Sequence, residues 1–102
     1  MTKELKNAVS RLRKLQDAAF AGKLDCVSTD IGLSFYNRHY ADGDHASVDV
    51  VVCIHNEDGE IEKHLMFSMS DRHCYQVGKK SDADWSIAEI LHEISAAVGY
   101  PV

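Results

Sequence analysis

Two runs of alternating apolar residues flank one turn signal, and they constrain the fold more than any other feature. In Ser47–His55 every second residue is valine or isoleucine, and a second run begins at Ile61. Between them stands Asp58-Gly59, a dipeptide that supplies the positive φ angles of a tight hairpin turn. Strict alternation is typical of strands that bury one face. The segment predicts an antiparallel hairpin whose second strand runs from Ile61 to about Met69.

Burial fixes the register of this hairpin. If Asp58-Gly59 is a two-residue turn, Val50 lies opposite Phe67 and Val52 opposite Leu65, so the apolar faces coincide. A slip by one residue would turn the apolar side chains of one strand toward the polar face of the other. On the reverse face, this register predicts three further pairs: Cys53 opposite His64, His55 opposite Glu62, and Val51 opposite Met66.

The flanking segments have a helical period. From Lys3 to Phe20 apolar residues recur at intervals of three and four, and Gly22 follows; this spacing predicts an amphipathic helix. Near the other end, Ser81-Asp82-Ala83-Asp84 offers oxygen atoms that can cap a helix. The apolar stripe that begins at Ile87 continues this helix, and Gly99 with Pro101 ends it.

Two more strands complete the expected sheet. Ile31 to Tyr36 alternates apolar with small or mixed residues, and a short strand is expected at His73 to Val77. Asn37 to His45 is polar and contains a glycine between two aspartates, so it is expected to be a loop. Trp85, at the start of the last helix, is interpreted as a core anchor in preference to an interface residue.

The expected fold is a single α+β domain spanning residues 1–102. It has two layers: an N-terminal helix, a four-stranded antiparallel meander and a C-terminal helix. Each helix has one apolar stripe, so the simplest packing lays both on the Val50/Phe67 face of the sheet. The alternative is a sheet sandwiched between the helices.

Composition and charge exclude several classes of protein. The chain is 102 residues long with 45% apolar and 26% charged residues and a net charge of −5, which is the composition of an ordinary acidic globular domain. No apolar run approaches the ~20 residues needed to span a bilayer, and the N-terminus lacks the apolar stretch of a secretory signal. We therefore expect a cytoplasmic protein that makes no membrane contact. Three cysteines without CxxC spacing argue against a disulfide framework.

If both helices cover one face of the sheet, the other face is unusually apolar for a surface in water. The pattern places Tyr36, Val51 and Met66 there, with either Cys74 and Gln76 or His73 and Tyr75 from the last strand. An apolar patch rimmed by polar groups is typical of a protein contact. The candidate protein-binding residues are those of this face and of the polar loop: Tyr36, Val51, Cys53, His64, Met66, His39, Asp42, Asp44 and His45. The same face is where a homodimer would form.

The residues that could carry chemistry are few. Cys53, His55, Glu62 and His64 share one face and include thiolate, imidazole and carboxylate ligands that zinc accepts, yet their spacing matches no established metal motif. Cys53 opposite His64 is the one pair suited to a thiolate and imidazolium, since the neighbours His73 and Cys74 point to opposite faces. The six glycines are scattered singly, so no phosphate cradle or cofactor motif is expected, and neither metal binding nor catalysis is the favoured interpretation.

A basic first segment offers an alternative function. Residues 1–23 carry six Lys and Arg against two acids, while the remainder carries five against fourteen. Lys6, Arg11, Arg13 and Lys14 could contact phosphates, but the acidic body would repel them.

The favoured hypothesis is therefore a small non-catalytic protein-binding module. It would act as an inhibitor or adaptor of a larger macromolecular complex, for example as a mobile-element or phage factor that blocks a host machine. The alternatives are a nucleic-acid accessory protein and a zinc- or thiol-dependent enzyme centred on Cys53 and His64.

Overall fold

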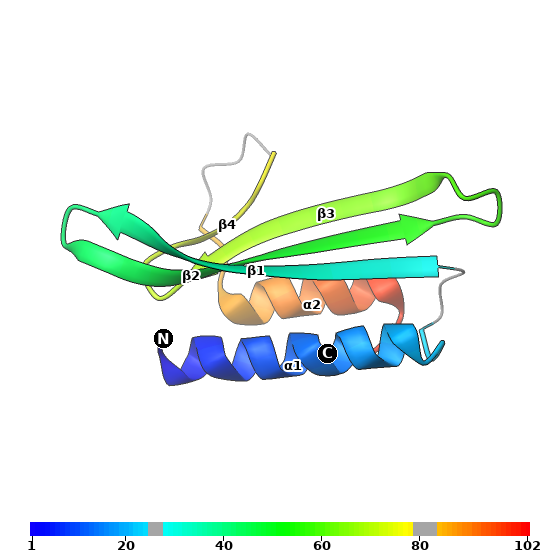
Figure 1. The fold of residues 1–102 in the computed structure, drawn as a ribbon, viewed down its shortest axis with the longest axis horizontal. Helices are drawn as coiled ribbons and strands as arrows, with labels where there is room; N and C mark the ends of the chain where they lie inside the picture. Colours follow the sequence, from blue (N-terminus) through cyan, green and yellow to red (C-terminus); the bar gives the residue numbers. More distant parts are fainter. Residues whose placement is uncertain (25–27, 79–83) are drawn as a thin grey trace.

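The computed structural model describes residues 1–24, 28–78 and 84–102, and it shows the expected α+β fold. Its elements are α1 (Lys3–Phe20), β1 (Ser28–Tyr40), β2 (Gly43–His55), β3 (Ile61–Ser70), β4 (Cys74–Gln76) and α2 (Ile87–Val98). The four strands form one antiparallel sheet in the order β1-β2-β3-β4. Figure 1 shows both helices side by side below the sheet. None of the described helices is long and apolar enough to cross a membrane.

The core lies between the sheet and the two helices, as the pattern predicted. Val50, Val52 and Phe67 are buried there together with Leu12 of α1 and Ile90 of α2. Burying a side chain of this size contributes roughly 1.5–3 kcal/mol. Trp85 packs its ring edge-on against Phe67, with 5.2 Å between the ring centroids. Trp85 is therefore part of the core. Because both helices cover the same face of the sheet, the alternative of a sheet sandwiched between the helices is wrong for this chain.

The register of the central hairpin is confirmed over most of its length. Val50 pairs with Phe67, Val52 with Leu65, Val51 with Met66 and Cys53 with His64. Near the turn the prediction is wrong, because the register shifts between Ile54 and His55, and His55 pairs with Ile61 in place of Glu62.

The cause of this shift is the loop chemistry of Asn56. Its side-chain oxygen accepts the backbone N–H groups of Asp58 and Glu60, each at 3.0 Å, and its own N–H donates to the Glu60 carbonyl at 2.9 Å. Gly59 takes a left-handed φ of 81°, where a residue with a Cβ is strained. Three residues rather than two thus form the turn, which leaves one extra residue in β3 as a bulge.

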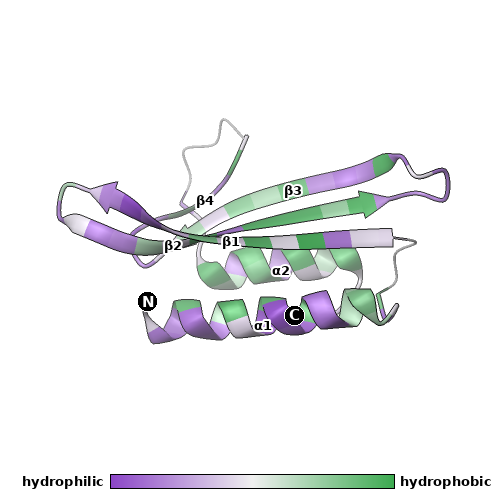
Figure 2. Cartoon of the chain, viewed as in Figure 1, coloured by the Kyte–Doolittle hydropathy of each residue, from purple (hydrophilic) through white to green (hydrophobic). Residues whose placement is uncertain are grey.

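The expected loop at Asn37 to His45 is in fact a continuation of two strands. β1 and β2 pair up to Tyr40 opposite Gly43, so the turn is Ala41-Asp42. β3 pairs with β2 only as far as Ser47, and residues 37–46 form a two-stranded arm beyond it, at the left of Figure 1. Figure 2 shows the arm as largely hydrophilic. Because the arm has no apolar face, its sequence shows no alternating hydrophobic pattern.

The last helix also begins later than expected. Ser86 is its N-cap: the Ser86 hydroxyl accepts the Glu89 N–H at 3.0 Å, and the Glu89 carboxylate accepts the Ser86 N–H at 3.1 Å. This reciprocal pair satisfies two backbone donors that the helix itself leaves free. Asp84 lies before the cap, and the other proposed cap positions, 81–83, are outside the described residues. At the far end Gly99 is the C-cap, so the helix ends where it was predicted to end, and Gly99 adopts the left-handed conformation.

Candidate protein-binding face

One face of the sheet lies opposite both helices, and we call it the open face. Because side chains alternate along a strand, it receives Tyr36 and Arg38 from β1, Asp49, Val51 and Cys53 from β2, His64, Met66 and Ser68 from β3, and Tyr75 from β4. The choice left open for β4 is settled, because Tyr75 pairs with Ser68 whereas Cys74 pairs with the buried Met69.

The centre of the open face holds a connected group of polar side chains that sequence reasoning missed in part. The Tyr36 hydroxyl donates to Asp49 Oδ1 at 2.7 Å and lies 3.2 Å from Ser68 Oγ. Arg38 Nη2 donates to the same hydroxyl oxygen at 3.1 Å. Four side chains from three strands are therefore joined through the Tyr36 hydroxyl.

Arg38 is also held between two aromatic rings. Its guanidinium carbon lies 5.8 Å from the Tyr36 ring centroid and 5.3 Å from that of Tyr75, within the range of cation–π attraction. Its hydrogen bond to Tyr75 raises the pKa of Arg38, an effect that burial opposes and the hydrogen bond with Tyr36 reinforces. The guanidinium is thus charged at all relevant pH values and fixed in direction. We call Tyr36, Arg38 and Tyr75 the arginine stack.

Beside the arginine stack lies the apolar part of the open face. Val51 and Met66 pair across β2 and β3 and are half-buried, and neither is covered by the described helices. Cys53 is a half-buried free thiol, and the opposed His64 is exposed. The predicted residues Tyr36, Val51, Cys53, His64 and Met66 therefore share one surface.

The remaining four predicted residues lie on the arm and are divided between its two sides. His39 forms an ion pair with Asp44, on the side that continues the helix-covered face. On the other side, His45 Nδ1 donates to Asp71 Oδ1 at 2.9 Å and Nε2 donates to Asp42 Oδ1 at 3.1 Å. His45 thereby ties the tip of the arm to the turn between β3 and β4.

The carboxylates beside the two ring nitrogens of His45 determine its charge. Both ring nitrogens face carboxylates, so both must carry hydrogen to bond, which requires the imidazolium. Its hydrogen bond to Asp71, and then that to Asp42, raises the pKa of His45. The hydrogen bond from His45 in turn lowers the pKa of Asp42. Arg72 Nε lies 3.6 Å from Asp42 Oδ2 and adds a second positive charge.

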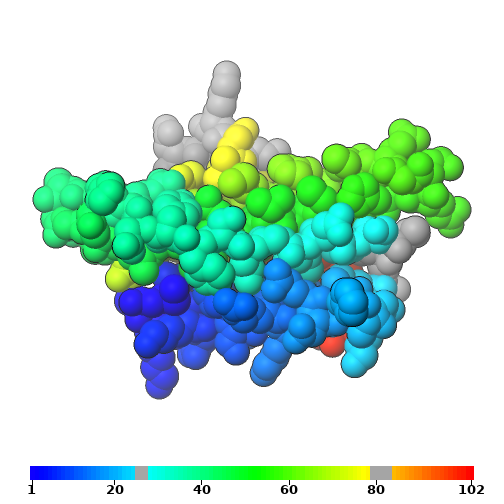
Figure 3. All heavy atoms as spheres, viewed as in Figure 1, coloured from blue at the N-terminus to red at the C-terminus, as the bar shows by residue number. Residues whose placement is uncertain are grey.

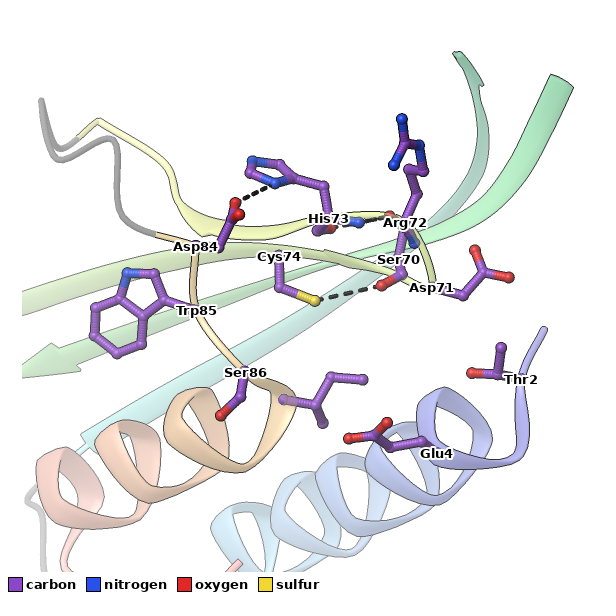
Figure 4. Close-up of a pocket in the computed structure, with 11 residues that line it drawn as sticks. Thr2, Glu4, Ser70, Asp71, Arg72, His73, Cys74, Asp84, Trp85 and Ser86 are labelled. Atoms are coloured by element: carbon purple, nitrogen blue, oxygen red, sulfur yellow. Dashed lines mark hydrogen bonds and ion pairs between the residues drawn. The ribbon is translucent and has the colours of Figure 1, made fainter. Parts of the chain in front are cut away.

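A hollow of about 350 Å³ lies between the starts of the two helices and the β3–β4 turn. Figure 4 shows Glu4, Asp84 and Cys74 around it, with His73 paired to Asp84. Cys74 Sγ donates to the Ser70 carbonyl at 3.3 Å. Burial raises the pKa of Cys74, and the negative charges of Glu4 and Asp84 add to the rise. The thiol is therefore held in its protonated, poorly nucleophilic form.

The proposed metal ligands do not assemble into one site. The register shift separates His55 from Glu62, and His55 Nδ1 instead lies 3.9 Å from Asp30 Oδ2. Across residues 1–24, 28–78 and 84–102, no three His, Cys, Asp or Glu side chains are grouped so that they could hold a metal ion.

Two of the four basic residues of the nucleic-acid alternative are engaged within the molecule. Arg11 donates to the Val102 carbonyl, and the Arg13 guanidinium lies 5.2 Å from the Phe35 ring centroid. Lys6 and Lys14 are exposed on α1.

Comparison of the chain with protein-family models, curated proteins and solved structures gives no match.

Proposed function

We propose that this protein is a non-catalytic binding module that docks a larger protein on its open face and so acts as an inhibitor or adaptor. The observation that carries the proposal is the arginine stack beside the half-buried pair Val51 and Met66. Tyrosine and arginine are enriched among the residues that dominate binding energy at protein interfaces. An apolar centre next to them is the usual anatomy of such a surface.

The rigidity of the arginine stack supports binding further. Immobilising a rotamer-rich side chain at an interface costs about 0.5–1.5 kcal/mol. Arg38 is already held by the hydroxyl and ring of Tyr36 and by the ring of Tyr75, so docking would lose little of its freedom. A partner would place a carboxylate or carbonyl oxygen against the guanidinium and apolar side chains against Met66.

Site-specific photo-crosslinking in the source cells tests this proposal. A crosslinking amino acid in place of Met66 should give an adduct with one partner protein, whereas the same group in place of the exposed Lys14 on α1 should give none. Arg38→Glu should abolish the adduct, and Arg38→Lys should weaken it because lysine lacks the planar stack. Lys23→Glu, which changes the net charge equally, should leave it intact.

The proposal would be overturned by adducts that form only from Lys14, by the absence of an adduct from Met66, or by an adduct that survives Arg38→Glu. With the partner identified, Arg38→Ala should weaken binding by about 2 kcal/mol, roughly thirtyfold in Kd.

A further inference from the structure

The arm is joined to the rest of the sheet at one end only. Its two strands pair with each other up to Tyr40 and Gly43, whereas β3 pairs with β2 only as far as Ser47. None of residues 37–46 is buried. Figure 3 shows the end of the arm, at the left, extending beyond the start of α1. A segment with so little buried surface opens at a small cost in free energy unless side-chain contacts hold it in place.

The tip of the arm is held on the β3–β4 turn by charged and aromatic side chains. His45 Nδ1 donates to Asp71 Oδ1 at 2.9 Å. Arg72 Nε lies 3.6 Å from Asp42 Oδ2, and the Arg72 guanidinium carbon lies 5.7 Å from the Tyr40 ring centroid. Both Asp71 and Arg72 belong to the β3–β4 turn, so each of these contacts joins the tip of the arm to that turn.

Arg38 makes a second connection, at the base of the arm. Its guanidinium carbon lies 5.3 Å from the ring centroid of Tyr75 on β4. Arg38 and His45 are directly opposed in the β1–β2 ladder, so both side chains leave the same face of the arm. A movement of the arm that separates His45 from Asp71 therefore also draws Arg38 away from Tyr75. The two contacts stabilise the same position of the arm.

The contact at the tip depends on one proton. His45 donates to Asp71 through Nδ1 and to Asp42 through Nε2, and only the imidazolium carries hydrogen on both nitrogens. A neutral ring would keep one hydrogen and turn the lone pair of its other nitrogen toward a carboxylate. Loss of the proton therefore replaces one of the two attractive contacts by a repulsive one.

The charged groups around His45 have both signs. The carboxylates of the β1–β2 turn and of the β3–β4 turn favour its positive charge, while the arginines of β1 and of the β3–β4 turn oppose it. These four groups are Asp42, Asp71, Arg38 and Arg72. The neutral ring of Tyr40 lies edge-on to His45, with 5.3 Å between the centroids. The carboxylates dominate, because hydrogen bonds to them raise the pKa of His45.

We propose that protonated His45 holds the arm on the β3–β4 turn with Arg38 stacked on Tyr75, and that loss of the proton releases the arm and weakens docking on the open face. The inference rests on the proposed function, because it concerns regulation of the same face. Release of the arm disperses the arginine stack, and a partner must then restore its order on binding. Docking and protonation of His45 are thus coupled, and each favours the other.

The distance between two spin labels tests the release of the arm in the purified protein. In a background with Cys26→Ser and Cys53→Ser, one label is attached at Lys63→Cys on β3. The other is attached at Asp44→Cys, on the opposite side of the arm from His45. The distance distribution should be narrow at pH 6 and broader at pH 9, because a released arm takes a range of positions. With His45→Gln it should be broad at both pH values.

Two controls separate release of the arm from other effects of pH. A label pair at Ser10→Cys on the exposed side of α1 and at Lys63→Cys should keep one distance at both pH values. His92→Gln, on the exposed side of α2, should leave the broadening of the arm distance intact. An arm distance that is equally narrow at pH 6 and pH 9, or a broadening with pH that persists in His45→Gln, would overturn the proposal.

Binding of the crosslinked partner, once purified, tests the regulation. The Kd of His45→Gln should exceed that of the wild type about fivefold at pH 6, and the two values should converge at pH 9. Comparison at equal pH cancels titrations that belong to the partner. A ratio of the two Kd values that is the same at both pH values would overturn the regulation. The absence of an adduct from Met66 would instead overturn the proposed function, whereas the spin-label result needs no partner.

Discussion

Two charged side chains, Arg38 and His45, have partners that come from distant parts of the chain. Arg38 on β1 reaches Tyr75 on β4, and His45 on β2 reaches Asp71 in the β3–β4 turn. The first contact joins residues 37 positions apart in the sequence, and the second joins residues 26 positions apart. Arg38 keeps its charge over the accessible pH range, whereas the charge of His45 depends on pH, and its hydrogen bonds to Asp71 and Asp42 raise the pKa of His45 above its ordinary value.

The pair of carboxylates around His45 predicts a pH-dependent stability. The folded-state pKa of His45 is raised, so its contribution is fully present below the ordinary histidine pKa near 6.5 and is lost as pH rises through the folded value. The folded-state pKa of Asp42 is lowered, so its contribution is present above the ordinary aspartate pKa and is lost as pH falls through the folded value. This cluster therefore stabilises the fold most at pH values between the ordinary pKa of aspartate and the ordinary pKa of histidine.

Urea unfolding of wild type and His45→Gln at pH 6 and pH 9 measures this contribution. We expect the wild type to exceed the variant in free energy of unfolding at pH 6 and this difference to shrink at pH 9. His92→Gln, on the exposed side of α2, should show no such change. A wild-type advantage over His45→Gln that is equal at both pH values, or larger at pH 9, would refute the imidazolium assignment.

At the scale of elements, each boundary is set by local hydrogen bonds, and two of these were misread from sequence. Asn56 closes a three-residue turn where Asp58-Gly59 alone predicted a two-residue one. Ser86 with Glu89 begins α2 where earlier polar residues also offered cap oxygens. Sequence shows the candidate caps, but which one is used depends on where the helix must enter the core.

The reciprocal cap of α2, in which the side chains of Ser86 and Glu89 each accept the other's backbone N–H, predicts a specific loss of stability on substitution. Ser86→Ala removes the acceptor for the Glu89 N–H and should lower the free energy of unfolding by about 1 kcal/mol, measured by urea denaturation. Ser10→Ala, at an exposed position within α1, should be neutral or slightly stabilising because alanine favours helix interiors. Equal effects of the two substitutions would show that the cap contributes nothing.

At the scale of the whole molecule, the sequence predicts the layers well because burial determines them. The facing of Val50 and Phe67 and the apolar stripes of both helices require one core on one side of the sheet. The arm of residues 37–46 could not be predicted in this way, because its strands are held by polar pairs such as His39 with Asp44. Polar pairing leaves no periodic hydrophobic signal.

The candidate site was only partly predictable for a related reason. Tyr36, Val51 and Met66 follow from alternation along their strands, but the contact of Tyr36 with Ser68 crosses an intervening strand and depends on the twist of the sheet. Arg38 was missed because its segment was interpreted as a loop. The spacing Tyr36-x-Arg38, which puts both side chains on one face of a strand, is the signal that could have found it.

We propose that the protein partner docks on the open face and not on the helical side. Amide chemical-shift mapping of the isotope-labelled protein, titrated with the crosslinked partner once purified, tests it most directly. We predict that the largest changes fall at Tyr36, Arg38, Val51, Met66 and Tyr75, while Lys6, Lys14 and the exposed residues of α2 stay constant. Changes confined to α1 and α2, with the strands unaffected, would contradict docking on the open face.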